Sequence, residues 1–519
     1  MNQSNKKKEV SCSWWIAGVF FLLMLSFIFD VWGDKKYIRD NPVVDEIFYT
    51  VDPVRHPHAS AETQRAGFKY NCNECHQSLD PPEVPQKLIG AHEEIILHHE
   101  EAMTCYTCHS RDNRERLNDI YGTEVLFGES ENICHRCHGP RYRDWKLGIH
   151  GRPLGYWDET KGKRTNITCV YCHNPHEPAF KPMKPSPPPI RNNYITGKRK
   201  LLMNDDHDIH EGFNDLGKEK MNRRDFLRRG AVLVSGMGAL AAALAPLKQL
   251  KNAFDPEEFV QKHYKEMTRE EMDEVLRRIE KKVEERYDVK ATVRDVKPMD
   301  GVEYGYALNL SKCNGSRKCV HACVNENNQS RSPEIQYITV LKMPQGTMDV
   351  DKGEVLYDPP TVPEEGYFYM PVQCHQCENP PCVKVCPVKA TWQEPDGITV
   401  IDYDWCIGCR YCEAACPYWA RKFNFAEPKI PKEKINPDMS YLSNRPRSNG
   451  VMEKCTYCLH RTREGRNPAC LEACPTGARV FGNILDPNSS ISYVLKNRRI
   501  FILKEAAGTI PRFFYYFDE

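Results

Sequence analysis

The sequence carries almost no net charge and few long apolar runs. Its 519 residues include 72 Lys and Arg against 71 Asp and Glu, so the net charge is +1. Such an even balance gives no support to a nucleic-acid-binding protein, which depends on excess positive charge. A mean hydropathy of −0.63 excludes a polytopic membrane protein and leaves room for one or two spanning segments. The length predicts two or three domains.

Cysteine is abundant by contrast, with 24 residues, yet almost none is left over for a disulfide. Eight lie in four Cys-x-x-Cys-His units, fifteen lie in four groups between Cys313 and Cys474, and Cys12 stands alone. In a chain that also holds 18 histidines, this distribution favours metal or cofactor ligation over disulfide bonding.

The N-terminal residues 1–34 predict a cytoplasmic tip followed by a membrane anchor. Residues 13–29 are uncharged and mostly apolar, follow three lysines, and have tryptophans at their edges, as anchoring helices do. A cleaved signal peptide is the alternative. It is disfavoured because Phe29-Asp30-Val31-Trp32 lacks the small residues that signal peptidase requires.

The four Cys-x-x-Cys-His units are typical of c-type haem attachment. Two thiols form thioethers with the porphyrin vinyl groups, and the adjacent imidazole becomes an axial iron ligand. Zinc ribbons are the alternative, but their Cys-x-x-Cys pairs need no following histidine. The predicted attachment residues are Cys72, Cys75 and His76; Cys105, Cys108 and His109; Cys134, Cys137 and His138; and Cys169, Cys172 and His173.

A haem iron that only carries electrons needs a second axial ligand, and this region holds enough further histidines to supply one to each haem. The predicted second ligands are His92, His99, His150 and His176. The alternatives are His58, His98, Met103 and Met183. Residues 35–190 show little periodicity, so we expect a mostly irregular and α-helical tetrahaem cytochrome c domain. In bacteria haem is attached outside the cytoplasm, so we expect this domain on the periplasmic side of the inner membrane.

Residues 191–220 predict a polar linker, and residues 221–246 resemble a twin-arginine export signal. The signal-like stretch has two arginines at 223 and 224, followed by a weakly apolar run. Such a signal acts from the cytoplasmic side, whereas the anchor would place residue 221 outside. We therefore hypothesise that the chain joins two subunits that are usually separate, the second beginning at Met221. A buried helix over residues 231–246 is the alternative.

Residues 247–299 predict a charged helical arm. Its apolar residues recur every three or four positions, which gives one stripe along a helix. The stripe residues are Met272, Leu276, Ile279, Val283 and Tyr287. We expect the stripe to pack on a neighbouring subunit, and a solvated helix is the alternative.

Three of the four later cysteine groups have the spacing of paired [4Fe–4S] clusters. Each has two close thiols, a third thiol, and a fourth after three intervening residues, followed by proline. Zinc is the alternative, but a tetrahedral zinc site does not need the Cys-Pro step. The groups are Cys374, Cys377, Cys382 and Cys386; Cys406, Cys409, Cys412 and Cys416; and Cys455, Cys458, Cys470 and Cys474.

The first group departs from this pattern. Cys313, Cys319 and Cys323 match the first, third and fourth positions, but Ser316 stands at the second. A hydroxyl is a poor ligand for a soft metal site. We therefore predict a [3Fe–4S] cluster here, or a [4Fe–4S] cluster with a weak oxygen ligand, beside three ordinary [4Fe–4S] clusters.

Three stretches carry a resemblance to a known family. They are Asn-Leu-Ser-Lys-Cys at 309–313, Cys-His-Gln-Cys-Glu-Asn-Pro-Pro-Cys at 374–382, and Asp-Trp-Cys-Ile-Gly-Cys-Arg at 404–410. Through them, residues 300–519 resemble the four-cluster ferredoxin-like subunits of the polysulfide reductase, formate-dependent nitrite reductase and alternative complex III types. The haem motifs resemble, more weakly, the multihaem cytochrome subunits of such complexes.

The resemblance implies a double ferredoxin-like α+β fold, clusters in a line and an integral-membrane quinone-binding partner subunit. It implies one cluster at Cys313, Cys319 and Cys474, and a second at Cys323, Cys455, Cys458 and Cys470. It implies a third at Cys374, Cys377, Cys382 and Cys416, and a fourth at Cys386, Cys406, Cys409 and Cys412.

The predicted fold class is therefore an N-terminal transmembrane helix, a tetrahaem cytochrome c domain and a ferredoxin-like domain. The predicted function is electron transfer within a membrane-bound respiratory complex, with the catalytic step on another subunit. One alternative is a catalytic multihaem reductase of a small oxyanion such as nitrite or sulfite, which needs an open haem position. Another is a scaffold whose metals only hold the fold.

Overall fold

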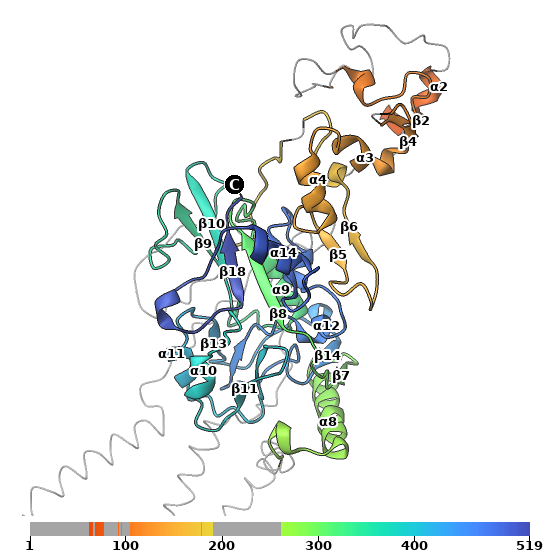
Figure 1. Ribbon diagram of the computed structural model, residues 1–519. Coiled ribbons are helices and arrows are strands. Elements are labelled where there is room, and N and C mark those ends of the chain that lie inside the picture. Colours follow the sequence, from red (N-terminus) through yellow and green to blue (C-terminus); the bar gives the residue numbers. More distant parts are fainter. Residues whose placement is uncertain are drawn as a thin grey trace, which may run out of the picture. The chain divides into compact units, whose positions relative to one another are not determined.

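The computed structural model describes residues 62–65, 68–76, 92, 95, 104–119, 121–177, 179–189 and 261–518 (Figure 1). Every described helix and strand lies in one compact unit, which is drawn from residues 41–191 and 263–519. The predicted anchor at 13–29, the linker at 191–220, the signal-like segment at 221–246 and His99 lie outside the described residues.

A four-stranded sheet lies at the centre of residues 263–518, in the order β16-β8-β18-β17 (Figure 1). Its strands are β8 (Tyr304–Asn309), β16 (Arg479–Asn483), β17 (Ile500–Phe501) and β18 (Phe513–Tyr516). β8 is buried along its whole length, runs antiparallel to β16 and runs parallel to β18. Tyr304 and Tyr306 are two residues apart on β8, so their side chains point to the same face, and both pack on Phe481.

The other face of this sheet is covered by α14 (Ser490–Asn497). Ala307 of β8 packs there with Ile491 and Val494 of the helix. Ile149, from the N-terminal part of the chain, enters the same cluster and is 2 % exposed. Residues 104–189 and 263–518 therefore share core packing.

Short helices and short pairs of strands make up the part of the chain that holds the clustered cysteines. The helices are α9 (Lys318–Glu326), α10 (Pro381–Lys384), α11 (Tyr411–Ala414), α12 (Leu459–Thr462) and α13 (Ala469–Glu472). The paired strands are β9 (Thr339–Pro344) with β10 (Tyr367–Val372), β11 (Thr391–Gln393) with β12 (Thr399–Ile401), β13 (Arg421–Phe423) with β15 (Met452–Lys454), and β7 (Thr292–Arg294) with β14 (Asp438–Ser440). The third cysteine of each group is the second residue of a helix, and the fourth cysteine follows about one turn later.

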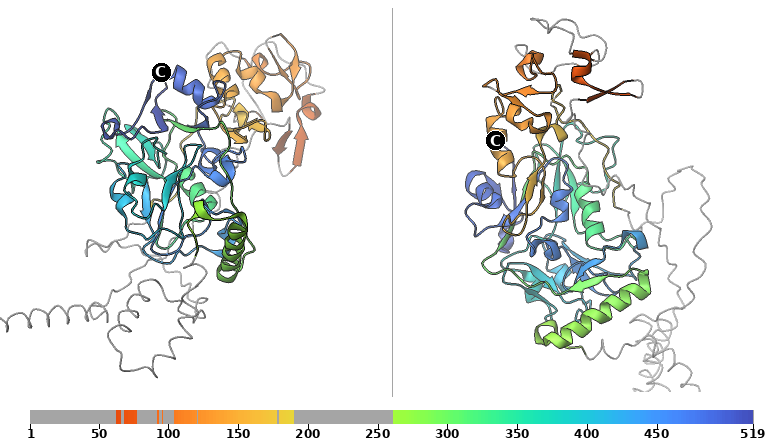
Figure 2. Two further views of the ribbon diagram at one scale, coloured as in Figure 1. Left: turned by 60° about the horizontal axis from the view of Figure 1, so that its bottom comes forward. Right: turned by 90° about the vertical axis from the view of Figure 1, so that its right-hand side faces the viewer.

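The predicted helical arm is present as α8 (Arg269–Tyr287; Figure 2). Thr268 begins it, since its hydroxyl accepts a hydrogen bond from the Glu271 amide at 3.3 Å and its own amide donates to the Glu271 carboxylate at 2.8 Å. Met272, Ile279 and Val283 of the predicted stripe are buried in this chain's own core. The stripe therefore packs within the chain, and the expected neighbouring subunit is not needed to cover it.

The predicted fold class is wrong for the N-terminal half. Its described elements are β1 (Glu62–Arg65), β2 (Phe68–Asn71), α2 (Cys72–His76), β3 (Leu117–Asn118), β4 (Glu124–Val125), α3 (Glu131–Cys134), α4 (Gly139–Lys146), β5 (Pro153–Gly155) and β6 (Arg164–Asn166). The strands form three two-stranded antiparallel sheets, and α4, with eight residues, is the longest helix described there. The helices described in this part have at most eight residues, so it is not a helical cytochrome domain.

The transmembrane part of the predicted fold class also lacks support. Across the described ranges, no helix has the length and apolar character needed to cross a bilayer. The longest of them, α8, has 19 residues, and charged side chains make up most of its sequence.

Candidate redox centres

We use the letters A to D for the four cysteine sets that the family resemblance implies. In each set, burial raises the pKa of one cysteine, and the neighbouring thiols raise it further. These cysteines are Cys313 in set A, Cys323 in B, Cys377 in C and Cys412 in D. The neighbours so identified are Cys319 and Cys474 in A; Cys455, Cys458 and Cys470 in B; Cys374, Cys382 and Cys416 in C; and Cys386 and Cys406 in D. Cys409, predicted for set D, is exposed.

The sets follow one another in a fixed order. After burial, Cys470 of set B raises the pKa of Cys319 in set A. Cys374 of set C acts in the same way on Cys455 of set B, and Cys382 of set C acts on Cys412 of set D. Thiols of sets A and B, of B and C, and of C and D therefore lie close enough to influence each other's pKa.

The surroundings of the sets suit iron–sulfur clusters. All four set C thiols line one cavity, together with Pro380, Pro381 and Pro417. Asn314 beside Cys313 and Gln373 beside Cys374 each have a buried amide nitrogen for which the described residues provide no acceptor. Inorganic sulfide accepts such hydrogen bonds. In the described ranges no three His, Cys, Asp or Glu side chains converge on a site for a single metal ion.

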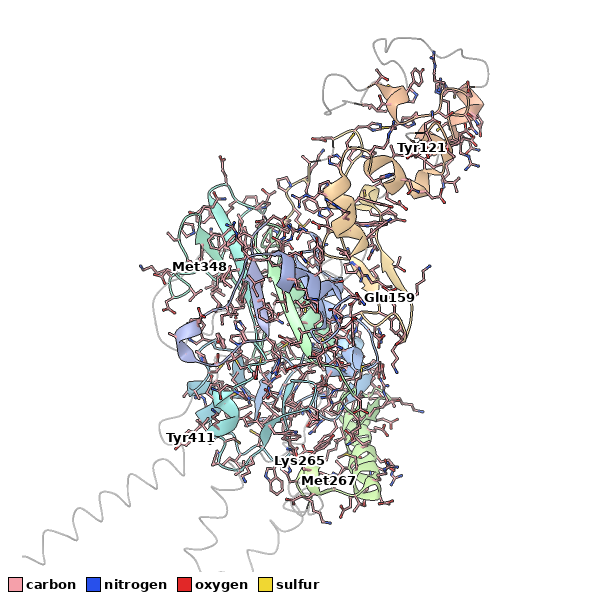
Figure 3. All side chains as sticks on the ribbon, in the orientation of Figure 1. Tyr121, Glu159, Lys265, Met267, Met348 and Tyr411 are labelled. Atoms are coloured by element: carbon pink, nitrogen blue, oxygen red, sulfur yellow. The ribbon has the colours of Figure 1, made fainter. Side chains whose placement is uncertain are left out.

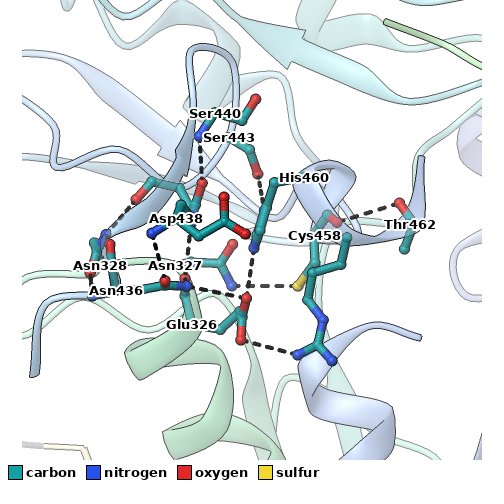
Figure 4. Close-up of polar contacts among 12 residues, drawn as sticks. Glu326, Asn327, Asn328, Asn436, Asp438, Ser440, Ser443, Cys458, His460 and Thr462 are labelled. Atoms are coloured by element: carbon teal, nitrogen blue, oxygen red, sulfur yellow. Dashed lines mark hydrogen bonds and ion pairs between the residues drawn. The ribbon is translucent and has the colours of Figure 1, made fainter. Parts of the chain in front are cut away.

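Several side chains donate hydrogen bonds to the cysteine sulfurs. The Gln329 side-chain nitrogen lies 3.2 Å from Cys323 Sγ. Asn327 Nδ2 lies 3.6 Å from Cys458 Sγ (Figure 4). Its neighbour Glu326 binds His460 at 2.8 Å, which ties α9 to α12. Donors of this kind stabilise negative charge on a cluster and thereby tune its reduction potential.

Two buried arginines also reach the sulfurs, and the sequence analysis missed both. Arg421 donates to Cys382 Sγ at 2.9 Å. Arg479 donates to Cys319 Sγ at 3.3 Å and also approaches Cys470 Sγ at 3.9 Å. Burial lowers the pKa of Arg421, but the Cys382 and Cys412 thiols outweigh it and raise the pKa overall. The sequence feature that could have identified both arginines is the motif Cys-Pro-x-x-Ala-Arg, which occurs at 416–421 and again at 474–479.

Ser316 occupies the place of a cysteine in its loop. The residue before the second cysteine is left-handed in the three complete groups, at Gln376 (φ 44°), Gly408 (φ 69°) and Tyr457 (φ 53°). Gly315, before Ser316, is left-handed as well, with φ 75°. The first group thus keeps the backbone of a cysteine loop while its second thiol is replaced by a buried hydroxyl.

The four Cys-x-x-Cys-His units also lie next to one another in order. Asn73 of the first unit is hydrogen-bonded to Asn113, just after the second, at 3.1 Å. Burial raises the pKa of Cys108 in the second unit, and the nearby Cys134 of the third unit raises it further. Cys134 and Cys169, which belong to the third and fourth units, lie close enough to shift each other's pKa, which is lowered for Cys134 and raised for Cys169.

Three of the four motif histidines face one of the predicted second ligands. His76 and His92 have ring centroids 5.8 Å apart with planes at 27°. His109 and His176 are 6.3 Å apart at 14°, and His150 and His173 are 6.3 Å apart at 9°. Imidazoles on opposite sides of one metal ion, each bonded at about 2 Å, bring their ring centroids about 6 Å apart. No such pair is recorded for His138 among the described residues.

Burial keeps two of these imidazoles neutral, as metal ligation requires. It is the main cause that lowers the pKa of His109 to about 4, followed by the neighbouring His176. It also lowers the pKa of His150 to about 3, followed by the charge of Lys312. His135, which lies between two attachment cysteines, packs against Tyr142 at 5.0 Å instead of facing a motif histidine.

Comparisons with known proteins cover the C-terminal half. The family described as "4Fe-4S dicluster domain" matches residues 366–436 and 437–484. The Hdr-like menaquinol oxidoreductase iron-sulfur subunit 1 of Archaeoglobus fulgidus is 43% identical over 210 residues, which are 38% of this chain and 71% of that protein. This chain belongs to that family of iron–sulfur subunits.

Subunits of other respiratory reductases agree with this assignment. A selenate reductase subunit of Mesobacillus selenatarsenatis is 35% identical over 57% of this chain and 98% of its own length. The iron-sulfur cluster-binding subunit of the menaquinone reductase of Nitratidesulfovibrio vulgaris is 36% identical over 41% of this chain and 88% of its own length. The ferredoxin-like prediction is therefore confirmed, and the protein is an electron-transfer subunit with several iron–sulfur clusters. The matched domain lies outside the haem-motif region, so the comparisons lend no support to a cytochrome domain.

Proposed function

We propose that this chain relays electrons between a quinone-reactive membrane subunit and another redox partner, through c-type haems and iron–sulfur clusters. The observation that carries the proposal is the pairing of three motif histidines with second histidines at 5.8 to 6.3 Å. Two axial imidazoles saturate a haem iron and leave no position for a substrate. This arrangement favours a relay over the catalytic multihaem reductase.

In this proposal each Cys-x-x-Cys-His unit attaches one haem through its two thiols. The pairs that would hold the haem irons are His76 with His92, His109 with His176, and His173 with His150. His99, outside the described residues, is the candidate partner of His138. The chain's contribution is to hold the planes of each pair of rings within 27° of parallel. Burial also keeps His109 and His150 neutral.

Sets A to D would hold four clusters, with Cys409 completing set D. Set A has three thiols and Ser316, so we propose a [3Fe–4S] cluster there, or a [4Fe–4S] cluster with a weak oxygen ligand. Sets B, C and D each have four thiols and suit [4Fe–4S] clusters. The bound metal supplies the one-electron chemistry, and the protein supplies buried donors that set each potential.

The partner proposed is an integral-membrane quinone-binding subunit, together with other redox subunits of the same complex. Among the relatives are subunits named for a menaquinol oxidoreductase and a menaquinone reductase, which supports a quinone-linked assembly. We place the assembly at the bacterial inner membrane with this chain on its periplasmic side, because c-type haem is attached there.

We further propose that residues after Met221 correspond to an iron–sulfur subunit with its own twin-arginine signal, joined here to a haem-binding subunit. Intact mass and N-terminal sequencing of native material test this. A single species whose mass is that of the 60.1 kDa polypeptide plus its covalent haems, with peptides continuous across Met221, would contradict separate subunits.

The proposed cofactors are tested by producing the full chain in a host able to attach c-type haem. We expect four covalent haems with low-spin spectra, together with iron and acid-labile sulfide for four clusters. Replacing Cys169 and Cys172 with alanine should remove one haem and leave the cluster content unchanged. Zinc in place of iron, or a chain without covalent haem, would refute the proposal.

A further inference from the structure

The loop of residues 149–151 contacts both chain segments that carry set A. Lys312, which directly precedes Cys313, donates a hydrogen bond from Nζ to the Ile149 carbonyl oxygen at 2.7 Å. Gly477 lies three residues after Cys474, and a Cβ added to it would stand 1.8 Å from the Gly151 carbonyl oxygen. His150, which faces His173, lies between these two contacts.

The glycine at 477 is required by this contact and not by its backbone angle. Gly477 has φ 61° in the turn that follows Cys474-Pro475. The equivalent positions after the other two Cys-Pro steps hold Lys389 (φ 55°) and Trp419 (φ 52°). Side chains are therefore tolerated at this left-handed position, and the close approach of Gly151 is what excludes one from 477.

Packing holds the 149–151 loop in place. Ile149 is buried against Val480 and Ile491. Upstream of the loop, the Asp144 carboxylate binds the Arg498 guanidinium at 3.0 Å. These contacts anchor the chain on the N-terminal side of His150.

A second segment of the N-terminal part covers the same set. The Ser186 amide donates to the Ser316 carbonyl oxygen at 2.8 Å. Arg317 donates to the Ser186 carbonyl oxygen at 3.0 Å, and Ser186 is fully buried. Set A is therefore enclosed by residues of the haem-motif part at two places.

We infer that electrons pass between the haem-binding and cluster-binding parts at this loop, from the His150–His173 pair to set A or in reverse. The inference rests on the proposed function and adds where its two cofactor series meet. One electron moves, so one iron centre is oxidised while the other cofactor is reduced, and no proton or covalent bond changes. Gly477 and Lys312 act as positioning residues, which hold the His150 loop close to Cys313 and Cys474.

The test compares Gly477→Ala with Gly508→Ala. Gly508 has nearly the same φ, 62°, but has no atom within 4 Å of an added Cβ, so both variants carry the same backbone strain. Only Gly477→Ala should displace the loop. We expect amide hydrogen exchange at 149–151 to be about tenfold faster in Gly477→Ala than in Gly508→Ala. In the full chain, the oxidised haem should shorten the spin relaxation of the set A cluster, and Gly477→Ala should weaken that effect.

Lys312→Met provides a second variant without a steric clash, and Lys312→Arg restores a donor. Lys312→Met should also weaken the haem–cluster relaxation effect, and Lys312→Arg should recover part of it. Two results would overturn the inference, provided that haem and cluster contents are normal. One is a parent chain without the relaxation effect, and the other is an effect that is unchanged in both Gly477→Ala and Lys312→Met. Absence of haem from the parent chain would instead refute the proposed function.

Discussion

At the residue scale, Arg479 is placed to set the potentials of two sets at once, because it reaches Cys319 of set A and Cys470 of set B. Reduction adds negative charge, which a buried guanidinium stabilises. We expect Arg479→Gln to lower the potentials of both clusters, by about 60 mV for each 1.4 kcal/mol lost in a one-electron couple. Arg479→Lys, which keeps the charge, should shift them less.

Potentiometric titration followed by EPR measures this shift. The matched variant is Arg421→Gln. Arg421 contacts Cys382 of set C, so its replacement should leave the potentials of sets A and B unchanged. Equal shifts of all clusters in both variants would mean that the arginines act through general destabilisation.

Ser316 gives a second prediction at this scale. The loop around it already has the backbone of a cysteine loop, so Ser316→Cys should add a fourth thiol without rearrangement. The oxidised parent chain should show a [3Fe–4S] EPR signal, and the variant should lose most of it as a fourth iron is held. A signal that is equally strong in both chains would argue that residue 316 does not face the cluster.

The cysteines could be grouped from the sequence because their spacing is itself a chemical constraint. The donors that approach the sulfurs could not be predicted in this way. Arg479 lies five residues from Cys474 but reaches Cys319, 160 positions away, through the pairing of β16 with β8. Such contacts are set by tertiary packing and leave no local period in the sequence.

At the element scale, α8 contributes to the stability of this chain, since its apolar stripe is buried in the chain's own core. Ile279→Ala removes a buried side chain and should lower the free energy of unfolding by about 2–5 kcal/mol. Lys281→Ala, on the exposed face of the same helix, should change it by less than about 0.5 kcal/mol.

Denaturant unfolding of the isolated chain measures both values. Equal stability of Ile279→Ala and Lys281→Ala would indicate that the stripe packs only when a partner subunit is present, as the sequence first suggested. The helix itself was predictable because 19 residues span several periods. The N-terminal hairpins were missed because strands of two to four residues are too short to show alternation.

Surface exposure also differs between elements. Tyr411 of α11 is 63 % exposed (Figure 3) and lies two residues after the exposed Cys409. Set D thus includes a cysteine that is exposed to solvent, Cys409. The loops of set A are instead covered by Ile149, Gly151 and Ser186.

At the scale of the whole molecule, the neighbouring groups define one continuous series. It runs through the four Cys-x-x-Cys-His units, crosses at the 149–151 loop, and continues through sets A, B, C and D. The motifs and the family resemblance supplied the candidate members of the series, and the fold adds which of them are neighbours. The order depends on which loops the fold brings together, and a single sequence does not carry that information.

The proposed series would carry electrons without binding a substrate only if its haem irons were six-coordinate, and this gives the last prediction. Removing a second axial ligand should open one position, so His150→Ala and His176→Ala should each convert one low-spin haem to a high-spin form that binds carbon monoxide. His135→Ala is the matched control, because its ring faces Tyr142 and no motif histidine. Carbon monoxide difference spectra measure the effect. If the parent chain already binds one equivalent of carbon monoxide at the His150–His173 site, this pair of rings does not ligate iron. The catalytic alternative then gains support.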